Sequence, residues 1–125
     1  IRDMDMAAKL HKVNRMDPTV MDAKKVIRMA TCAGARALGL EKMAGTLKAG
    51  KKADLILLDL NNPHLTPLYN EYSHLVYAAS GSDVDTAMIN GRLVMKNRRL
   101  LTIDESEVIA QVRQIAERIK KSLPR

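Results

Sequence analysis

Histidine and cysteine side chains are the first candidates for metal or nucleophilic chemistry in this chain. The three histidines are His11, His64 and His74, and none belongs to a His-x-His or His-x-x-x-His ligand pair. The single cysteine, Cys32, lies in an apolar run beside small residues, which favours a buried, unreactive thiol. A hydrolytic metal site needs several converging ligands, so we expect these four residues to be structural or surface groups.

The sequence also contains no clear motif for acid–base catalysis or for phosphate binding. Four carboxylates are candidates, but no spacing singles out a catalytic pair among Asp3, Asp5, Glu71 and Asp83. Gly45, Gly50 and Lys51 have the spacing of a phosphate loop, Gly-x-x-x-x-Gly-Lys-Ser/Thr. Lys52 stands where that motif requires Ser or Thr, and the next segment is a predicted strand. A phosphate loop must open a helix, so that its free N–H groups meet the anion. We therefore predict no catalytic, cofactor-binding or metal-binding residue in this chain.

Length and composition indicate one ordinary domain with an aliphatic core. The chain has 125 residues, no Phe or Trp, three Tyr and eight Met, so methionine makes the expected core adaptable. One cysteine allows no internal disulfide, and no stretch resembles a signal peptide or a membrane span. These features predict a cytoplasmic protein that does not enter membranes. Because the first residue is Ile, we also expect a fragment of a longer protein.

The formal net charge of +7 raises the question of an anionic partner. The basic residues are spread over the chain as doublets, with no aromatic residues between them: Lys24-Lys25, Lys51-Lys52, Arg98-Arg99 and Lys120-Lys121. Such doublets are typical of solvated surfaces, so we expect no nucleic-acid binding.

Helical signals dominate the first 40 residues. Apolar spacing predicts a helix over residues 2–13, and Asp17-Pro18 predicts the start of a second helix that runs to about Ala30. A short third helix over 33–38 should end at Gly39 in a left-handed conformation. The positions expected to be buried are Met4, Met6, Ala7, Leu10 and Val13 in the first helix and Val20, Met21, Val26, Ile27 and Ala30 in the second.

A strand should follow the two glycines. Gly45 and Gly50 permit positive φ, and Lys51-Lys52 are expected to keep the turn in water. The apolar run 55–58 predicts a strand that is buried on both faces, and Leu47-Lys48 predicts a short edge strand.

The second half contains a hairpin and two further helices. Residues 63–72 are expected to form an ordered loop, and 73–79 a compact helix. Asn90-Gly91 lies between two β-prone runs, which is the strongest short signal for a hairpin. A C-terminal helix over 105–122 should be capped by Asp104, with Thr102 as the alternative, and Pro124 should end it. Its apolar stripe consists of Val108, Ile109, Val112, Ile115, Ala116 and Ile119.

The order of these motifs resembles the C-terminal end of metal-dependent amidohydrolases. The similar stretches are Ala33–Leu40, then Gly45-Thr46-Leu47, then Gly50-Lys51-Lys52-Ala53-Asp54-Leu55. Finer matches at 8–12, 63–69 and 74–84 resemble the branch that deaminates 5′-methylthioadenosine and S-adenosylhomocysteine. Chlorohydrolases and guanine or cytosine deaminases share the looser pattern.

The resemblance implies an α+β fold in three parts. Residues 1–40 would be the last outer helices of a (β/α)₈ barrel, and 41–103 would belong to a small β-rich domain with a hairpin and a short helix near 73–79. Residues 104–125 would form the C-terminal helix. In the family, a barrel-bound zinc or other divalent ion activates a water that displaces ammonia. Its ligands lie on barrel segments upstream of this sequence, so we assign no metal or catalytic role to any residue here.

Two functions therefore compete at this point. One is a structural segment of such a deaminase, whose partner is the missing N-terminal barrel portion and which self-associates through exposed apolar helix faces. The other is an independent basic binding or interaction module without catalytic activity. Contiguous exposed apolar surface distinguishes them, because a fragment should display it and a module should not.

Overall fold

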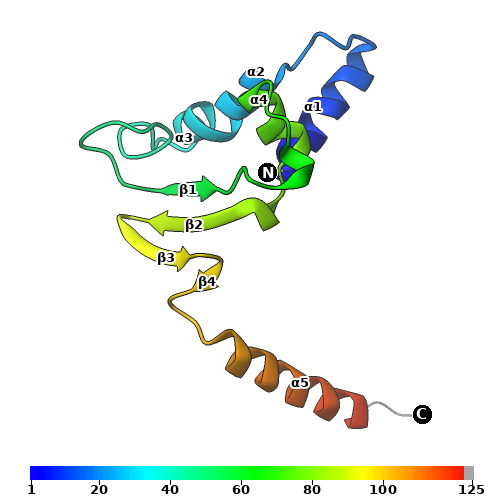
Figure 1. The fold of residues 1–125 in the computed structure, drawn as a ribbon, viewed down its shortest axis with the longest axis vertical. Helices are drawn as coiled ribbons and strands as arrows, with labels where there is room; N and C mark the ends of the chain where they lie inside the picture. Colours follow the sequence, from blue (N-terminus) through cyan, green and yellow to red (C-terminus); the bar gives the residue numbers. More distant parts are fainter. Residues whose placement is uncertain (123–125) are drawn as a thin grey trace.

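The computed structural model describes residues 1–122 and shows an α+β arrangement. Helices α1 to α4 lie beyond one edge of a four-stranded antiparallel sheet, and helix α5 lies beyond the other edge (Figure 1). The sheet order is β1-β2-β3-β4, so each strand pairs with its neighbour in sequence. None of the helices within these residues has the length and apolar character that a membrane span requires.

The helical part contains α1 (Arg2–Arg15), α2 (Ala23–Arg28) and α3 (Gly34–Ala37). A π-helical turn, Met29–Ala33, joins α2 to α3, so the second and third predicted helices are one continuous element. The predicted left-handed stop at Gly39 is confirmed, with φ of 69°.

The predicted helix start at Asp17 is wrong. The Asp17 carboxylate accepts hydrogen bonds from the backbone N–H and the hydroxyl of Thr19, at 2.8 and 2.6 Å, and so closes a local turn. Met21 then adopts a φ of 50°, which a right-handed helix does not allow. The helix starts after Asp22 instead, whose carboxylate accepts a bond from the Lys25 N–H at 2.9 Å.

The helical core is small and built around alanines. Ala8, Ala23, Val26 and Val76 are buried together, with Met4, Met21 and Ile27 packed against them. Ala8 lets α1 approach its neighbours closely, whereas the side chains of Met6, Leu10 and Val13 stay 55%, 61% and 69% exposed. The predicted burial of these three is therefore wrong within residues 1–122, as is that of Ala30, which is exposed.

The sheet contains β1 (Leu55–Leu58), β2 (Val84–Ile89), β3 (Arg92–Lys96) and β4 (Arg99–Leu100). The hairpin turn between β2 and β3 is confirmed, because Asn90 and Gly91 both have positive φ, at 51° and 77°. A second turn with two positive φ values, 49° at Asn97 and 61° at Arg98, connects β3 to β4. This turn was not predicted.

Strand β1 lies at the edge of the sheet, and this overturns the expectation of burial on both faces. The side chains of Ile56 and Leu57 are 46% and 56% exposed. Residues 47–48 form no strand, so the predicted short edge strand is also wrong.

The connection from β1 to β2 contains most of the remaining helical structure. It includes the 3₁₀ turn Pro63–Leu65, helix α4 (Glu71–Ser73) with the π-helical turn His74–Ala78, and the 3₁₀ turn Gly81–Asp83. The helix expected over 73–79 is thus present but begins two residues earlier, at Glu71. Val76 on this helix is buried.

Helix α5 (Glu105–Ser122) confirms the predicted C-terminal helix. The Asp104 carboxylate accepts bonds from the N–H groups of Ser106 and Glu107, at 3.0 and 3.1 Å, so Asp104 rather than Thr102 is the cap. The predicted stop at Pro124 lies outside the described residues.

Candidate functional site

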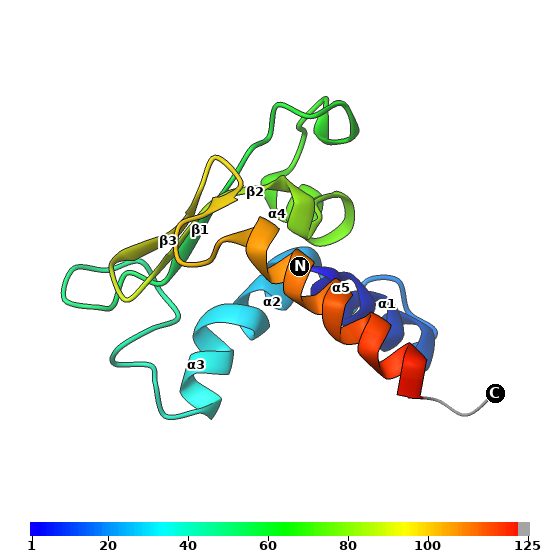
Figure 2. The ribbon, with the colours of Figure 1, turned by 90° about the horizontal axis from the view of Figure 1, so that it is seen from below.

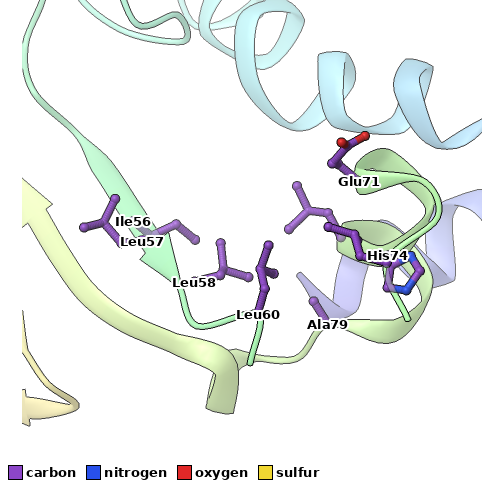
Figure 3. Close-up of a pocket in the computed structure, with 9 residues that line it drawn as sticks. Ile56, Leu57, Leu58, Leu60, Glu71, His74 and Ala79 are labelled. Atoms are coloured by element: carbon purple, nitrogen blue, oxygen red, sulfur yellow. The ribbon is translucent and has the colours of Figure 1, made fainter. Parts of the chain in front are cut away.

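An apolar groove of about 280 Å³ lies between β1 and α4 (Figure 3). In Figure 3, Leu58 and Leu60 extend toward the turn that carries His74 and Ala79. Seven of the lining residues are aliphatic and two are polar: Ile56, Leu57, Leu58, Leu60, Leu68, Leu75 and Ala79, with Glu71 and His74. Such a lining suits other apolar side chains and offers few polar groups that could orient a substrate.

The imidazole of His74 is engaged by the chain that surrounds the groove. Its Nδ1 lies 3.1 Å from the carbonyl oxygen of Asn70, and its Nε2 lies 3.0 Å from that of Pro67. A neutral ring carries one N–H and can donate to only one of these carbonyls. Because both carbonyl oxygens belong to the loop before α4, a bond to either one ties His74 to that loop.

The second polar cluster centres on Asp83, whose side chain is only 3% exposed. Its Oδ2 accepts bonds from the backbone N–H of Ser80 at 2.8 Å, the Ser80 hydroxyl at 3.0 Å and His64 Nε2 at 3.0 Å. Its Oδ1 accepts a bond from the amide of Asn62 at 3.2 Å. The Ser80 N–H bond is the largest cause that lowers the pKa of Asp83 below 3.8, followed by His64, while burial opposes them.

Ser80, His64 and Asp83 have the residue types of a catalytic triad but not its connectivity. The serine hydroxyl and the imidazole both contact the same carboxylate oxygen, Asp83 Oδ2. A nucleophilic serine needs the imidazole as its base, with the carboxylate behind the imidazole. The cluster is therefore a structural junction, which ties the 3₁₀ turn at Pro63 to the start of β2. His64 and Asp83 lie 19 residues apart in the sequence, and no local motif indicates that they pair.

The glycine-rich segment is organised around one lysine. The Lys51 ammonium donates to the carbonyl oxygens of Glu41 and Ala44, and the latter distance is 3.1 Å. The two lysines, both expected to keep the turn in water, therefore differ: Lys51 is half-buried and bonded to the chain, whereas Lys52 is exposed. Gly45 lies against α3 and the π-helical turn, where a Cβ atom would come within 2.6 Å of Ala35 Cβ.

The Ala53-Asp54 pair anchors the hairpin. The Asp54 carboxylate accepts a bond from the Asn90 N–H at 2.5 Å, and the Gly91 N–H donates to the Ala53 carbonyl at 3.0 Å. Two residues that follow the glycine turn thus hold the tip of a hairpin that comes much later in the sequence. These two bonds give the Ala53-Asp54 part of the glycine-rich stretch a structural role in the sheet.

The other candidates do not converge. His11 and Asp3 are exposed, and the Asp5 carboxylate pairs with Lys9 at 2.7 Å. Cys32 is half-buried rather than buried, with its thiol 3.6 Å from the Arg28 carbonyl oxygen. Over residues 1–122, no three His, Cys, Asp or Glu side chains come together in a way that could hold a metal ion.

Comparison with known proteins gives consistent matches at the level of sequence. The amidohydrolase family model matches residues 1–94. A 5-methylthioadenosine/S-adenosylhomocysteine deaminase from Syntrophus aciditrophicus is 62% identical over 98% of this chain, which corresponds to 28% of that protein. A 5′-deoxyadenosine deaminase from Methanosarcina acetivorans is 48% identical over 94% of this chain and 27% of its own length. The chain thus spans little more than a quarter of the curated relatives that it matches.

Solved structures agree with these matches. An adenosine deaminase from Xanthomonas campestris with bound zinc superposes with a TM-score of 0.87 and 36% identity, over 94% of this chain and 27% of that one. The zinc complex of atrazine chlorohydrolase TrzN from Arthrobacter aurescens superposes with a TM-score of 0.79 at 22% identity, over 90% of this chain and 25% of that one, which is a likeness of fold. The family model covers most of the chain, and the chain belongs to the amidohydrolase family.

Proposed function

We propose that this chain is the C-terminal segment of a metal-dependent hydrolytic deaminase that acts on an adenosine-type nucleoside and releases ammonia. The substrate class is 5′-methylthioadenosine and S-adenosylhomocysteine. The observation that carries the proposal is the 62% identity to the Syntrophus deaminase over nearly the whole chain. The solved relative with 36% identity is also named as an adenosine deaminase, which supports a purine nucleoside as the substrate.

The proposed role of the segment is structural. Residues 1–40 would complete the outside of the barrel, 41–103 would form part of a small β-rich domain, and 104–125 would be the C-terminal helix. The N-terminal portion of the same protein would then cover the apolar surface that this chain leaves open on α1 and β1. Exposed aliphatic side chains that support this arrangement are Met6, Leu10, Val13, Ile56 and Leu57.

Zinc or another divalent metal would be held by that N-terminal portion, in a protein of the cytoplasm. When bound, such an ion lowers the pKa of a water and so supplies the nucleophile for hydrolysis. The residues of this chain support the site indirectly. The Asp83 junction, the Asp54 anchor and the Lys51 contacts keep the sheet and the loops in place.

The test is ammonia release by the protein expressed from its complete reading frame. We expect turnover of 5′-methylthioadenosine and S-adenosylhomocysteine, with 5′-deoxyadenosine and adenosine as comparison substrates. Treatment with a chelator should abolish the activity, and added zinc should restore it. Turnover of none of these nucleosides by the metal-loaded protein would reject the proposal, and turnover of a triazine or guanine instead would move it to another branch of the family.

A further inference from the structure

The Asn90-Gly91 turn holds two groups that can react with each other. The chain contains six asparagines, and only Asn90 precedes a glycine. Asparagine is a thermolabile residue, because the backbone nitrogen of the next residue can attack its side-chain amide carbon. Glycine hinders this attack least, since it has no Cβ atom. The sequence therefore makes Asn90 the asparagine of this chain that is most open to spontaneous modification.

The reaction requires only the turn itself and water. The Gly91 nitrogen loses its proton and forms a bond to Cγ of Asn90, while the bond from Cγ to the amide nitrogen breaks. Ammonia leaves, and a succinimide ring closes. Water then opens the ring at either of its two carbonyl carbons. One product has an aspartate at position 90, and the other is its isomer, in which the main chain runs through the former side chain.

Two hydrogen bonds restrain the turn in the folded chain. The Gly91 N–H donates to the Ala53 carbonyl at 3.0 Å, and the Asn90 N–H donates to the Asp54 carboxylate at 2.5 Å. The attack requires the Gly91 nitrogen to turn toward the Asn90 side chain and to lose its proton, which breaks the first of these bonds. The negative charge of Asp54 nearby also opposes removal of that proton.

These bonds, rather than crowding, restrain the turn within residues 1–122. A Cβ atom on Gly91 would meet no atom within 4 Å. Figures 1 and 2 show the turn at the end of the sheet where β1 begins, and Ala53 and Asp54 directly precede β1. Local opening of this end of the β1–β2 pair is therefore sufficient to release the nitrogen.

We propose that Asn90 is a deamidation site of this protein, and that the contacts from Ala53 and Asp54 control how fast it reacts. Each product weakens the contacts that protect the turn. An aspartate at position 90 adds a negative charge close to Asp54, and the isomer lengthens the main chain of a two-residue turn by one atom. The inference does not depend on the proposed deaminase activity, because that reaction concerns a free nucleoside and is measured separately.

The test follows the protein expressed from its complete reading frame during incubation at mildly alkaline pH. Peptide mass spectrometry locates each exchange of an amide NH₂ for OH. We expect modification at Asn90 that is slow in the folded wild type and about ten-fold faster or more in protein unfolded by guanidinium. Asn97 is the internal control and should react far more slowly than Asn90 in the unfolded protein, because Arg98 follows it.

Variants separate local opening from a general loss of stability. Asp54→Ala should react about ten-fold faster than the wild type while still folded, and Asp54→Asn, which keeps an amide oxygen as acceptor, should lie between them. Asp83→Asn is the matched control, because it alters the junction at the opposite end of the β1–β2 pair, and its rate should stay within about two-fold of the wild type. Asn90→Gly keeps a residue that suits positive φ and should show no mass change at this position.

Circular dichroism verifies that each variant is folded before the rates are compared. No modification of Asn90 in the unfolded protein would show that it is not a deamidation site. Equal rates in folded and unfolded protein would show that the fold gives no protection. Rates for both Asp54 variants equal to that of the wild type, or an equal acceleration by Asp83→Asn, would show that the contacts to the turn do not control the reaction.

Discussion

The Asp54 carboxylate accepts a hydrogen bond from the backbone N–H of Asn90 at 2.5 Å, and this contact joins the end of the glycine turn to the tip of the hairpin. Beside it, the Gly91 N–H donates to the Ala53 carbonyl at 3.0 Å. The two bonds hold β1 in register with β2, because they close the end of that strand pair. Both positions of the turn have positive φ, so the carboxylate stabilises a conformation that the backbone adopts at a cost.

Removal of that acceptor should weaken the sheet. We expect Asp54→Ala to lower the free energy of unfolding by about 1–3 kcal/mol, since the Asn90 N–H loses a charged acceptor. Asp54→Asn keeps an amide oxygen at the same place and should lose about half as much. Urea unfolding of the full-length protein measures both, and an Asp54→Ala variant as stable as the wild type would contradict the anchoring role.

Gly45 and Gly50 allow two requirements for glycine to be separated, namely a positive φ and the lack of space for a Cβ atom. Both have positive φ, at 83° and 85°. A Cβ atom at Gly45 would also lie 2.6 Å from Ala35 Cβ, whereas one at Gly50 would meet no atom within 4 Å.

We therefore expect Gly50→Ala to lose about 1–2 kcal/mol from backbone strain alone and Gly45→Ala to lose clearly more. Adding Ala35→Gly to the Gly45→Ala variant should recover part of the difference, because it removes the atom that clashes. Thermal or urea unfolding provides the comparison. Equal losses at the two glycines would show that the close approach to α3 has no energetic weight.

The Asp83 junction should make stability depend on acid pH. The folded state holds the pKa of Asp83 below its ordinary value of 3.8, chiefly through the Ser80 N–H bond and then through His64. Between the two pKa values the unfolded state binds more protons, so stability rises with pH in that window. The contribution is complete above pH 3.8 and is lost as the pH falls through the folded pKa.

Asp83→Asn should flatten this part of the profile, and urea midpoints measured across the acid range would show it. The difference between variant and wild type is the quantity to follow, because the pKa values of Asp17 and Asp22 are lowered as well, by bonds from Thr19 and Lys25 respectively. Parallel profiles for the two proteins would mean that Asp83 titrates alike in the folded and unfolded states.

The two adjacent lysines should differ in importance. Lys51 donates to the carbonyl oxygens of Glu41 and Ala44, whereas Lys52 is exposed. Lys51→Met keeps the aliphatic stem and removes the donors, and it should destabilise the protein by about 1 kcal/mol. Lys52→Met is the control and should change stability by less than about 0.5 kcal/mol. Faster proteolysis of the 39–52 loop in the Lys51 variant alone would support this difference, and similar behaviour of the two variants would argue against it.

The sequence by itself determined the features that depend on short-range chemistry. The Asn90-Gly91 turn, the left-handed Gly39, the Asp104 cap and the periodic helix over 105–122 all follow from local backbone preference or from hydrogen bonds within a few residues. The family likeness also follows from local motifs, and the family model that matches residues 1–94 confirms it. The absence of a recognisable ligand pair or phosphate loop is another local property, on which the prediction of no site residue depends.

Only the tertiary structure decided which apolar faces are covered and which polar groups meet. Hydrophobic spacing shows that a face can be buried, but not whether a partner element lies over it. Met6, Leu10 and Val13 form a regular stripe and remain exposed, while the core uses Ala8. The pairs Asp54–Asn90 and His64–Asp83 join residues far apart in sequence, and only the folded chain brings them within hydrogen-bond distance. The helix starts after Asp22 rather than at Asp17, because the Asp17 carboxylate closes a turn with Thr19 and the positive φ of Met21 interrupts any helix from that point.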